Sequence, residues 1–462
     1  MSDRKRPTGA RSEAPNPSSS GQRILAARPS RVEPARRRLV EPPLAPAATA
    51  RAPGGGAPRD RAGRSRTREP SRFFLVALVG ATALGPVSVH MFLPALPAIQ
   101  AAFGVTAGVA QLTLSVSMLA IAFATLAYGP LSDRFGRRPV LIAGQAVFLL
   151  GSATCAWAPG IATLVAGRIL QAAGACSGMV LARAIVRDAY PLERVTSVLA
   201  YFTLAMAAFP MFTPAIGGAL IDFVHWRAVF VFSLGVGVLA LVAVAFGVWE
   251  TRPERAPGAT GVASGAGVLL RKPAFWAYAA TGAFGSAAFF GFISGLPYLM
   301  IQVMGRPARE YGYYFVSLAA AFMLGSLVAA RASARVGRDR MLALAVLGML
   351  TSGGSLLALH ALGVWHPLAL FAPGVLLTFA QGAAGPNAQA GAVSGDPAHA
   401  GAASGVLGFV QTFAAAGFAQ AVGSFQDGTP LPLSLCVVLA GLGGLLSLAL
   451  LPRGVRPAQP IG

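Results

Sequence analysis

The sequence predicts an all-α membrane protein whose twelve transmembrane helices form two six-helix bundles. Two observations predict this class. Of the 462 residues, 55% are hydrophobic and only 11% are charged, whereas a soluble domain carries about 25% charged residues. In addition, apolar runs of about twenty residues, the length that crosses a bilayer, recur from residue 73 to residue 451. Such a chain exposes its apolar surface to lipid.

The longest interior break between apolar runs lies at 250–272 and divides the twelve runs six and six. Its RPERAPGATGVASGAG stretch has the composition of a linker. We therefore predict an N-terminal bundle at 72–249, a cytoplasmic linker at 250–272, a C-terminal bundle at 273–452 and a short tail at 453–462. The predicted spans are 73–98, 107–128, 139–157, 161–182, 195–220, 228–249, 275–302, 311–331, 341–361, 366–391, 401–423 and 432–451.

The distribution of positive charge predicts the orientation. Loops after even-numbered runs carry fourteen Lys and Arg residues, whereas loops after odd-numbered runs carry three, at Arg227, Arg306 and Arg309. Because basic loops remain on the cytoplasmic side of a membrane, both chain termini are expected in the cytoplasm.

About half of the net charge of +21 comes from one terminal segment. Residues 1–72 hold 17 of the 37 Lys and Arg residues against six acidic ones, and the segment has few aromatic residues. It cannot bury enough apolar surface to offset the entropy of ordering. We predict a disordered basic tail at 1–71 that lies near anionic lipid, and we expect no nucleic-acid partner.

The stretch GPLSDRFGRRPVL at 129–141 joins the second and third runs. Its carboxylate can pair with a neighbouring Arg or stabilise a helix N-terminus, and a contact made only while helices are close would act as a conformational latch. The alternative is simple cytoplasmic anchoring by positive charge. A similar stretch at 325–340, GSLVAARASARVGRDR, suggests two parallel repeats. The predicted latch residues are Gly129, Asp133, Arg134, Gly136, Arg137 and Arg138.

The stretch at 129–141 is similar to motif A of the major facilitator superfamily. LVAGRILQAAGA at 164–175 resembles the second motif of the family, and FPMFTPAIGGAL at 209–220 resembles its antiporter motif, although the usual Gly-Pro reads Thr213-Pro214. MFLPALPAI, QLTLS, ARAIVRD, GPNAQA and HAGAASGVLGFVQ are similar to the Bcr/CflA branch of drug efflux transporters.

The resemblance covers about residues 73–452. It implies the major facilitator fold and a secondary active transporter that exports small amphipathic compounds, including antibiotics. It also implies proton antiport by alternating access, with the proton gradient as the energy source and no cofactor. The expected place is the bacterial inner membrane, as a multi-pass monomer.

Two ionisable residues lie deep within the predicted spans. Arg168 is about seven residues into its run, roughly 10 Å deep, where an Arg normally faces a wet cavity or a counter-charge; the alternative is a packed structural Arg. His90 lies in the same depth band on the first run. Matching depth on different helices predicts one shared site. In the Bcr/CflA pattern the position of His90 is usually Asp, which is taken to carry the proton.

No Asp or Glu lies inside a predicted span. Proton coupling needs a group that changes charge, and imidazole titrates near pH 6.5, so His90 is the candidate proton carrier. A polar substrate contact and structural packing remain alternatives for His90. Without a carboxylate in the membrane, we expect weaker preference for cationic compounds than for neutral or zwitterionic ones.

Other polar residues in the spans are candidates for a substrate cavity, although a single residue of this kind more often makes a helix–helix hydrogen bond than a ligand contact. Pro214, Gly217 and Gly218 suit a bend at a moving seam or ordinary small-residue packing. The polar candidates are Gln111, Ser115, Gln171, Asn387 and Gln411.

Other function classes compete with multidrug export. The fold does not set the substrate, so the alternative is an exporter or importer of one metabolite, such as a sugar, nucleoside or amino acid, with His90 as a substrate contact. An enzyme is not expected, because the chain has no GxxxxGK[ST], HExxH or GxSxG stretch. The three cysteines have no metal-site spacing, and no metal is expected. Asp222 and His225 could gate the exit.

Overall fold

A computed structural model of the chain describes residues 70–252, 267, 269–394 and 399–451. The described residues form helices and no strand, so the all-α class is confirmed. Within them, eleven helices are long and apolar enough to cross a membrane. The predicted count of twelve spans therefore stays a prediction. The predicted tail at 1–71, apart from its last two residues, most of the linker, and the predicted tail at 453–462 lie outside the described residues.

The helices of the predicted N-terminal bundle are together called the N-terminal half. The Ser71 hydroxyl accepts a hydrogen bond from the Phe74 N–H and caps the first helix. The first helix ends at His90, and the chain continues through a short turn into a second helix. Pro94 lies in that turn and Pro97 at the start of the second helix, and neither has an N–H to continue the hydrogen bonds of the first helix. The elements are α1 (Arg72–His90), a 3₁₀ turn (Leu93–Ala95), α2 (Leu96–Phe103), α3 (Ala107–Phe135), α4 (Arg137–Ala156), α5 (Ile161–Ala189), α6 (Leu192–Phe223) and α7 (Ala228–Gly247).

The helices after the linker are called the C-terminal half. Gly337 joins two of them with φ 90°, just as Gly136 joins α3 and α4 with φ 101°. Both values favour glycine, so the structure repeats the turn of the two similar sequence stretches. The elements are α9 (Pro273–Pro297), a π-helical turn (Tyr298–Val303), α10 (Ala308–Val336), α11 (Arg338–Ala361), α12 (Pro367–Ser394), α13 (Ala400–Ser424) and α14 (Leu431–Ala449).

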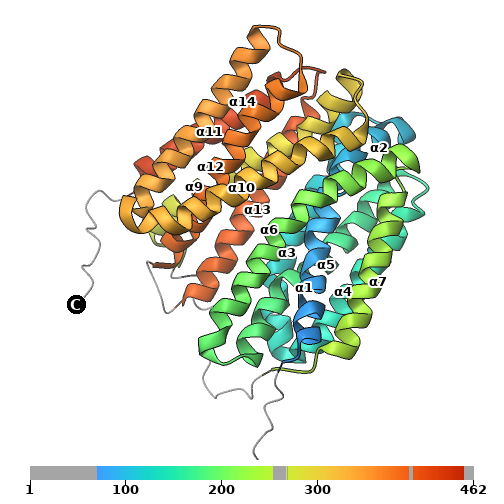
Figure 1. Cartoon of the computed structure of the whole chain (residues 1–462), viewed down its shortest axis with the longest axis vertical. Coiled ribbons are helices and arrows are strands. Elements are labelled where there is room, and N and C mark those ends of the chain that lie inside the picture. Colours follow the sequence, from blue (N-terminus) through green and yellow to red (C-terminus); the bar gives the residue numbers. More distant parts are fainter. Residues whose placement is uncertain (1–69, 253–266, 268, 395–398, 452–462) are drawn as a thin grey trace, which may run out of the picture. The chain divides into compact units, whose positions relative to one another are not determined.

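The two halves repeat one packing pattern (Figure 1). In the N-terminal half α5 packs against α1, α3 and α4, and in the C-terminal half α12 packs against α9, α10 and α11. The halves meet along two seams, α3 with α13 and α6 with α10. In this pattern α3 corresponds to α10, and α6 corresponds to α13. Exchanging the corresponding helices therefore turns the α3–α13 seam into the α10–α6 seam. This exchange fits two parallel repeats related by an axis between the halves.

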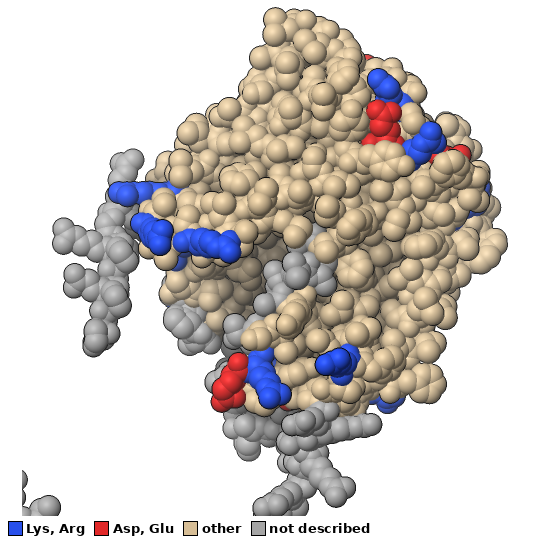
Figure 2. Space-filling model, in the orientation of Figure 1, with Lys and Arg blue, Asp and Glu red and all other residues tan. Residues whose placement is uncertain are grey.

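On the surface of the molecule, charged residues lie near the helix ends. Figure 2 shows Lys, Arg, Asp and Glu gathered near the helix ends of this face, with a broad uncharged region between them. Large apolar side chains are exposed along the helices, including Phe123, Leu239 and Phe246. An exposed apolar surface of this kind is stable in lipid rather than in water.

Small residues allow α6 to approach two other helices closely. A Cβ on Gly217 would collide with the Met91 carbonyl that follows α1, and one on Gly218 would collide with the Ala308 carbonyl of α10. From the other side of the same seam, a Cβ on Gly312 would collide with the Ala215 backbone. Gly218 of the predicted bend therefore brings the N-terminal and C-terminal halves into backbone contact, whereas Gly217 brings α6 against the end of α1 within the N-terminal half.

The Gly218 contact predicts a stability effect. Gly218→Ala adds a methyl group against backbone that cannot yield, so we expect the variant to lose about 1–3 kcal/mol of stability. The midpoint of thermal unfolding in detergent measures it. Gly235→Ala on α7 is the matched control, since no atom lies within 4 Å of its added Cβ. Equal behaviour of the two variants would contradict the packing described for the seam.

Candidate functional site

A cavity of about 280 Å³ lies between the two halves. The walls come from α1, α3, α5 and α6 on one side and from α9 and α13 on the other. These wall residues include no Asp, Glu, Lys or Arg, and most of them are apolar. The N-terminal half contributes Gly85, Pro86, Val89, His90, Met118, Ile121, Met179, Met206 and Pro210, and the C-terminal half contributes Ser286, Phe290, Gln411 and Thr412.

His90 lies in this wall, at the last residue of α1. The centre of its ring is 6.3 Å from that of Phe290 and 5.9 Å from that of Phe315, both in the C-terminal half. Its Nδ1 atom is buried and makes no hydrogen bond of ordinary geometry to a described residue. The imidazole thus lies where the two halves meet, and the nearby Pro86 carbonyl one turn earlier in α1 is the hydrogen-bond acceptor that its side chain approaches.

Arg168 is fully buried within the N-terminal half. Its Nη1 donates to the Ser88 carbonyl at 2.8 Å and to Gln171 Oε1 at 2.6 Å, and its Nε donates to the Thr113 carbonyl at 3.3 Å. The guanidinium also lies over the Phe92 ring, 4.1 Å from its centre. Among the described residues no carboxylate pairs with it, so carbonyl dipoles and an aromatic face solvate this charge.

The two predicted deep residues are therefore linked through α1. Arg168 binds the carbonyl of Ser88, two residues before His90, so the groups do lie at a similar level. Of the two, His90 lies in the cavity wall, whereas Arg168 is not among the wall residues. Arg168 holds α5 against α1 and α3, which positions the end of α1 that bears His90. Gln171 instead donates to the Ser152 hydroxyl of α4 at 2.9 Å.

Of the other predicted cavity residues, one lies in the cavity wall and three do not. Gln411 lies in the cavity wall. The Ser115 hydroxyl and the Asn387 amide donate to carbonyls one turn earlier in their own helices, at 3.1 Å and 2.9 Å. Gln111 is fully buried against α13, and its amide makes no hydrogen bond to a described residue. These three residues lie outside the wall.

Several wall residues were not predicted from the sequence. Met118, Met179 and Met206 come from three different helices, and Phe290 and Thr412 come from the C-terminal half. Methionine and phenylalanine are ordinary in any apolar span, so no sequence signal separates these four residues from lipid-facing ones. Thr412 is a polar residue in a span, next to the predicted Gln411, and the same polar signal could have found it. Flexible thioether side chains adapt to irregular apolar shapes, which suits a wall that accepts varied molecules.

Asp222, near the end of α6, binds the start of α10 across the seam. Its two carboxylate oxygens accept from the N–H groups of Ala308 and Arg309, each at 3.0 Å, and the Arg309 guanidinium lies at 3.5 Å. The residue before α10 is Pro307, which gives no side-chain cap. The N-terminus of α10 is therefore capped by a carboxylate from the opposite half.

Further contacts between the halves lie at the same end, here called the Asp222 end. Every side-chain hydrogen bond that joins two described residues of opposite halves lies at this end, so the structure is closed there. These bonds run from Tyr298 to the Ala107 carbonyl at 3.4 Å, from Gln302 to Gln100 at 3.1 Å, and from Gln420 to the Gly108 carbonyl at 2.9 Å, besides those of Asp222.

The predicted latch residues lie at the opposite end, here called the Asp133 end. Asp133 pairs with Arg137 at 2.6 Å, and Arg137 also binds Asp188 of α5 at 3.0 Å. Glu250, just after α7, accepts from the N–H groups of Arg137 and Arg138 at 2.9 Å and 3.2 Å. These contacts all lie within the N-terminal half, and they join α3, α4, α5 and the segment after α7.

The remaining latch residues have different environments. Gly136 forms the turn, and a Cβ there would lie 2.6 Å from the Glu250 carboxylate. Gly129 lies within α3, where an added Cβ would have no atom within 4 Å. Arg134 is exposed, with its guanidinium 5.2 Å from the centre of the Phe135 ring. Sequence reasoning missed Glu250 because it is distant in the chain from the turn that it caps.

The Glu250 carboxylate predicts a pH-dependent stability. Its partial burial acts to raise its pKa, but the backbone N–H groups of residues 137, 138, 251 and 252 outweigh burial, so its pKa lies below the ordinary value. Its contribution is therefore present above about pH 4.3 and is lost as the pH falls through the lowered pKa. We expect Glu250→Gln to melt earlier than wild type at neutral pH, with a difference that vanishes in acid.

Thermal unfolding in detergent across this pH range measures the effect. Glu193→Gln, at the exposed start of α6, is the matched control and should follow wild type at every pH. A Glu250→Gln difference that stays constant into strong acid would show that the carboxylate does not act through its charge.

Known proteins are similar to this chain over most of its length. The sequence model described as Major Facilitator Superfamily matches residues 78–419. A bicyclomycin resistance protein homolog of Haemophilus influenzae is 28% identical over 81% of this chain and 96% of its own length. Multidrug resistance protein D of Escherichia coli is 27% identical over 84% of this chain and 98% of its own length.

Solved structures share the fold. A crystal structure of a bacterial homolog to the human lysosomal transporter Spinster, in an inward-facing and occupied conformation, superposes with a TM-score of 0.67. It covers 82% of this chain and 95% of its own chain at 16% sequence identity. At this identity the likeness concerns the arrangement of the helices alone.

Proposed function

Because the chain belongs to the major facilitator superfamily, a family of membrane transporters, we propose that it exports small amphipathic compounds in exchange for protons. It is a transporter and not an enzyme, and the resemblance to Bcr/CflA-type drug efflux transporters is confirmed by relatives that match most of its length. In our proposal twelve helices cross the bacterial inner membrane, the protein works as a monomer, and both termini lie in the cytoplasm.

The observation that carries the proposal is a cavity shared by both halves and closed at one end. Its walls come from both sides of the two seams, so a rocking motion of one half against the other would change access to it. The bonds of the Asp222 end would break in that motion, and the Asp133 end would close. Alternating access of this kind around a central site is the mechanism we propose.

The wall chemistry supports a substrate class. Methionine and phenylalanine side chains offer an adaptable apolar surface, and the imidazole of His90, the amide of Gln411 and the hydroxyl of Thr412 offer a few hydrogen bonds. No carboxylate among these residues would neutralise a cation, and burial of an unpaired charge is costly. We propose neutral and zwitterionic compounds as preferred substrates over permanent cations.

His90 is the proposed proton carrier. It lies in the cavity wall, beside the Phe290 and Phe315 rings of the C-terminal half. An imidazole in this place could accept a proton when one side of the membrane is open and release it when the other is open. The Arg168 network would position α1 during this exchange. The proton gradient then supplies the energy, with no cofactor.

Everted membrane vesicles with a pH-sensitive dye test the proposal. Once the vesicles are energised, we expect a neutral antibiotic to dissipate the proton gradient with wild type and not with His90→Ala or Arg168→Ala. His360→Ala, which removes a histidine outside the cavity wall, is the matched control and should behave as wild type. A permanent dication should produce a much smaller signal.

Two results would contradict parts of this account. If labelled antibiotic crosses the membrane while no compound moves protons, transport is not proton-coupled and His90 is a contact or packing residue. If one metabolite alone drives proton movement, the protein is a specific transporter rather than a multidrug exporter.

A further inference from the structure

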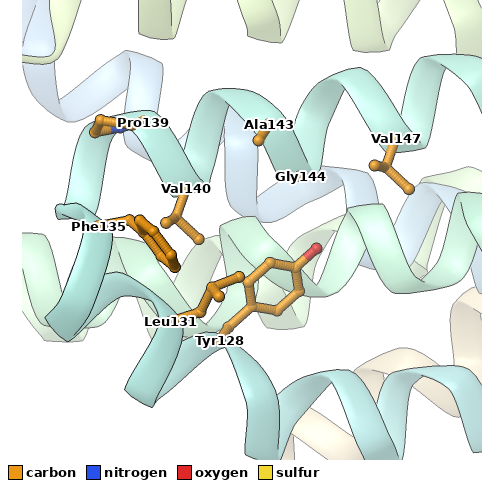
Figure 3. Close-up of a pocket in the computed structure, with 8 residues that line it drawn as sticks. All are labelled: Tyr128, Leu131, Phe135, Pro139, Val140, Ala143, Gly144 and Val147. Carbon is orange, nitrogen blue, oxygen red and sulfur yellow. The ribbon is translucent and has the colours of Figure 1, made fainter.

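A second cavity lies outside the central one, in a groove between α3 and α4. Its volume is about 410 Å³. Figure 3 shows Tyr128, Leu131 and Phe135 of α3 facing Val140 and other side chains of α4 across the groove. Apart from the Tyr128 hydroxyl, every side chain of the wall is apolar. The groove starts at the α3–α4 turn and therefore lies at the Asp133 end.

The geometry of the two helices explains the groove. Gly136 turns the chain sharply between α3 and α4, yet each of these helices packs more extensively against α5 than against the other. The Tyr128 hydroxyl donates to the Ala173 carbonyl of α5 at 3.0 Å, and a Cβ on Gly144 would collide with Ser177 of α5. The base of the groove is thus held rigidly by α5.

The groove opens to the outside of the helices. Leu131 is 43% exposed and Phe135 is 57% exposed, and Ala143 is exposed as well. In a protein that crosses a membrane, the medium at such a surface is lipid. The segment from Tyr128 to Phe135 spans about 10 Å of helix, which is long enough to contact a large part of one acyl chain.

A cation lies at the mouth of the groove. Arg134 is exposed beside Phe135, with its guanidinium 5.2 Å from the centre of that ring. No carboxylate pairs with Arg134 among the described residues, whereas the neighbouring Arg137 is paired with both Asp133 and Asp188. The charge of Arg134 is therefore available to an anion at the level of the helix ends, where lipid headgroups lie.

We propose that this groove is a binding site for an anionic phospholipid. One acyl chain lies between α3 and α4, and the headgroup phosphate pairs with Arg134. The apolar wall accounts for the chain, and the uncompensated cation accounts for the preference for a negative headgroup. The site is independent of the central cavity and does not rest on the proposed transport activity.

Photoreactive lipids locate the site directly. The full-length protein is placed in nanodiscs containing either phosphatidylglycerol or phosphatidylcholine with the same diazirine-bearing acyl chain, and labelled peptides are mapped by mass spectrometry. We expect labelling of 128–147 to be about fivefold higher with phosphatidylglycerol, the ratio that one nearby cation provides. Arg134→Gln should reduce that labelling to the phosphatidylcholine level.

Matched variants separate the groove from general effects. Ala143→Phe fills the groove and should abolish labelling by both lipids, whereas Ala146→Phe, exposed on the same helix outside the groove, should not. Arg335→Gln removes an exposed cation at the same position relative to Gly337 as Arg134 has relative to Gly136 and should change nothing.

Three results would overturn the proposal. These are equal labelling of 128–147 by the two lipids with wild type, equal labelling of Ala143→Phe and Ala146→Phe, and a dimer that Ala143→Phe converts to a monomer. The last would show that a second copy of the chain covers the groove.

Discussion

The rest of the structure depends on the bond between the Asp222 carboxylate and the first N–H groups of α10. A helix begins with N–H groups that have no partner in the helix, and here the other half of the molecule supplies one for two of them. Beside this bond, the α6–α10 seam is largely backbone against backbone at Gly218 and Gly312. While the Asp222 bond is present, it holds the two halves together. Once it breaks, the glycine contacts of this seam offer little resistance to a movement of one half relative to the other.

The second seam follows the same plan. At the end of α13, Gln420 donates to the Gly108 carbonyl of α3, and a Cβ on Gly108 would lie 3.1 Å from Ser424. Both seams therefore combine small residues with a polar bond at the Asp222 end. Since α3 with α13 and α6 with α10 are equivalent pairs of the two repeats, the closure at this end has the symmetry of the fold.

Local sequence patterns predicted what depends on neighbouring residues. The apolar runs predicted the helices, and the repeated Gly-Arg stretch marked turns that the structure forms at Gly136 and Gly337. The positions of His90 and Arg168 along their apolar runs predicted that the two residues lie at a similar height along the helices, as the Arg168 bond to the Ser88 carbonyl shows. Contacts between distant segments were not predicted. Glu250 binds the N-terminus of α4 although it is 113 residues from Arg137 in the chain. The carbonyl groups that solvate Arg168 belong to the backbone, which is the same for every residue type, so the sequence does not mark them. The methionines of the cavity wall look like any other apolar residue in a span.

Cross-linking at the Asp222 end tests most directly whether this bond holds the cavity closed. The Gln100 and Gln302 amides meet across the halves at 3.1 Å, so cysteines at these positions, in a chain whose three buried cysteines are replaced by alanine, should react with a short thiol cross-linker. Asp222→Ala should lower the yield severalfold, whereas Asp427→Ala, which removes a carboxylate from the loop between α13 and α14, should not. An unchanged yield with Asp222→Ala would contradict the account.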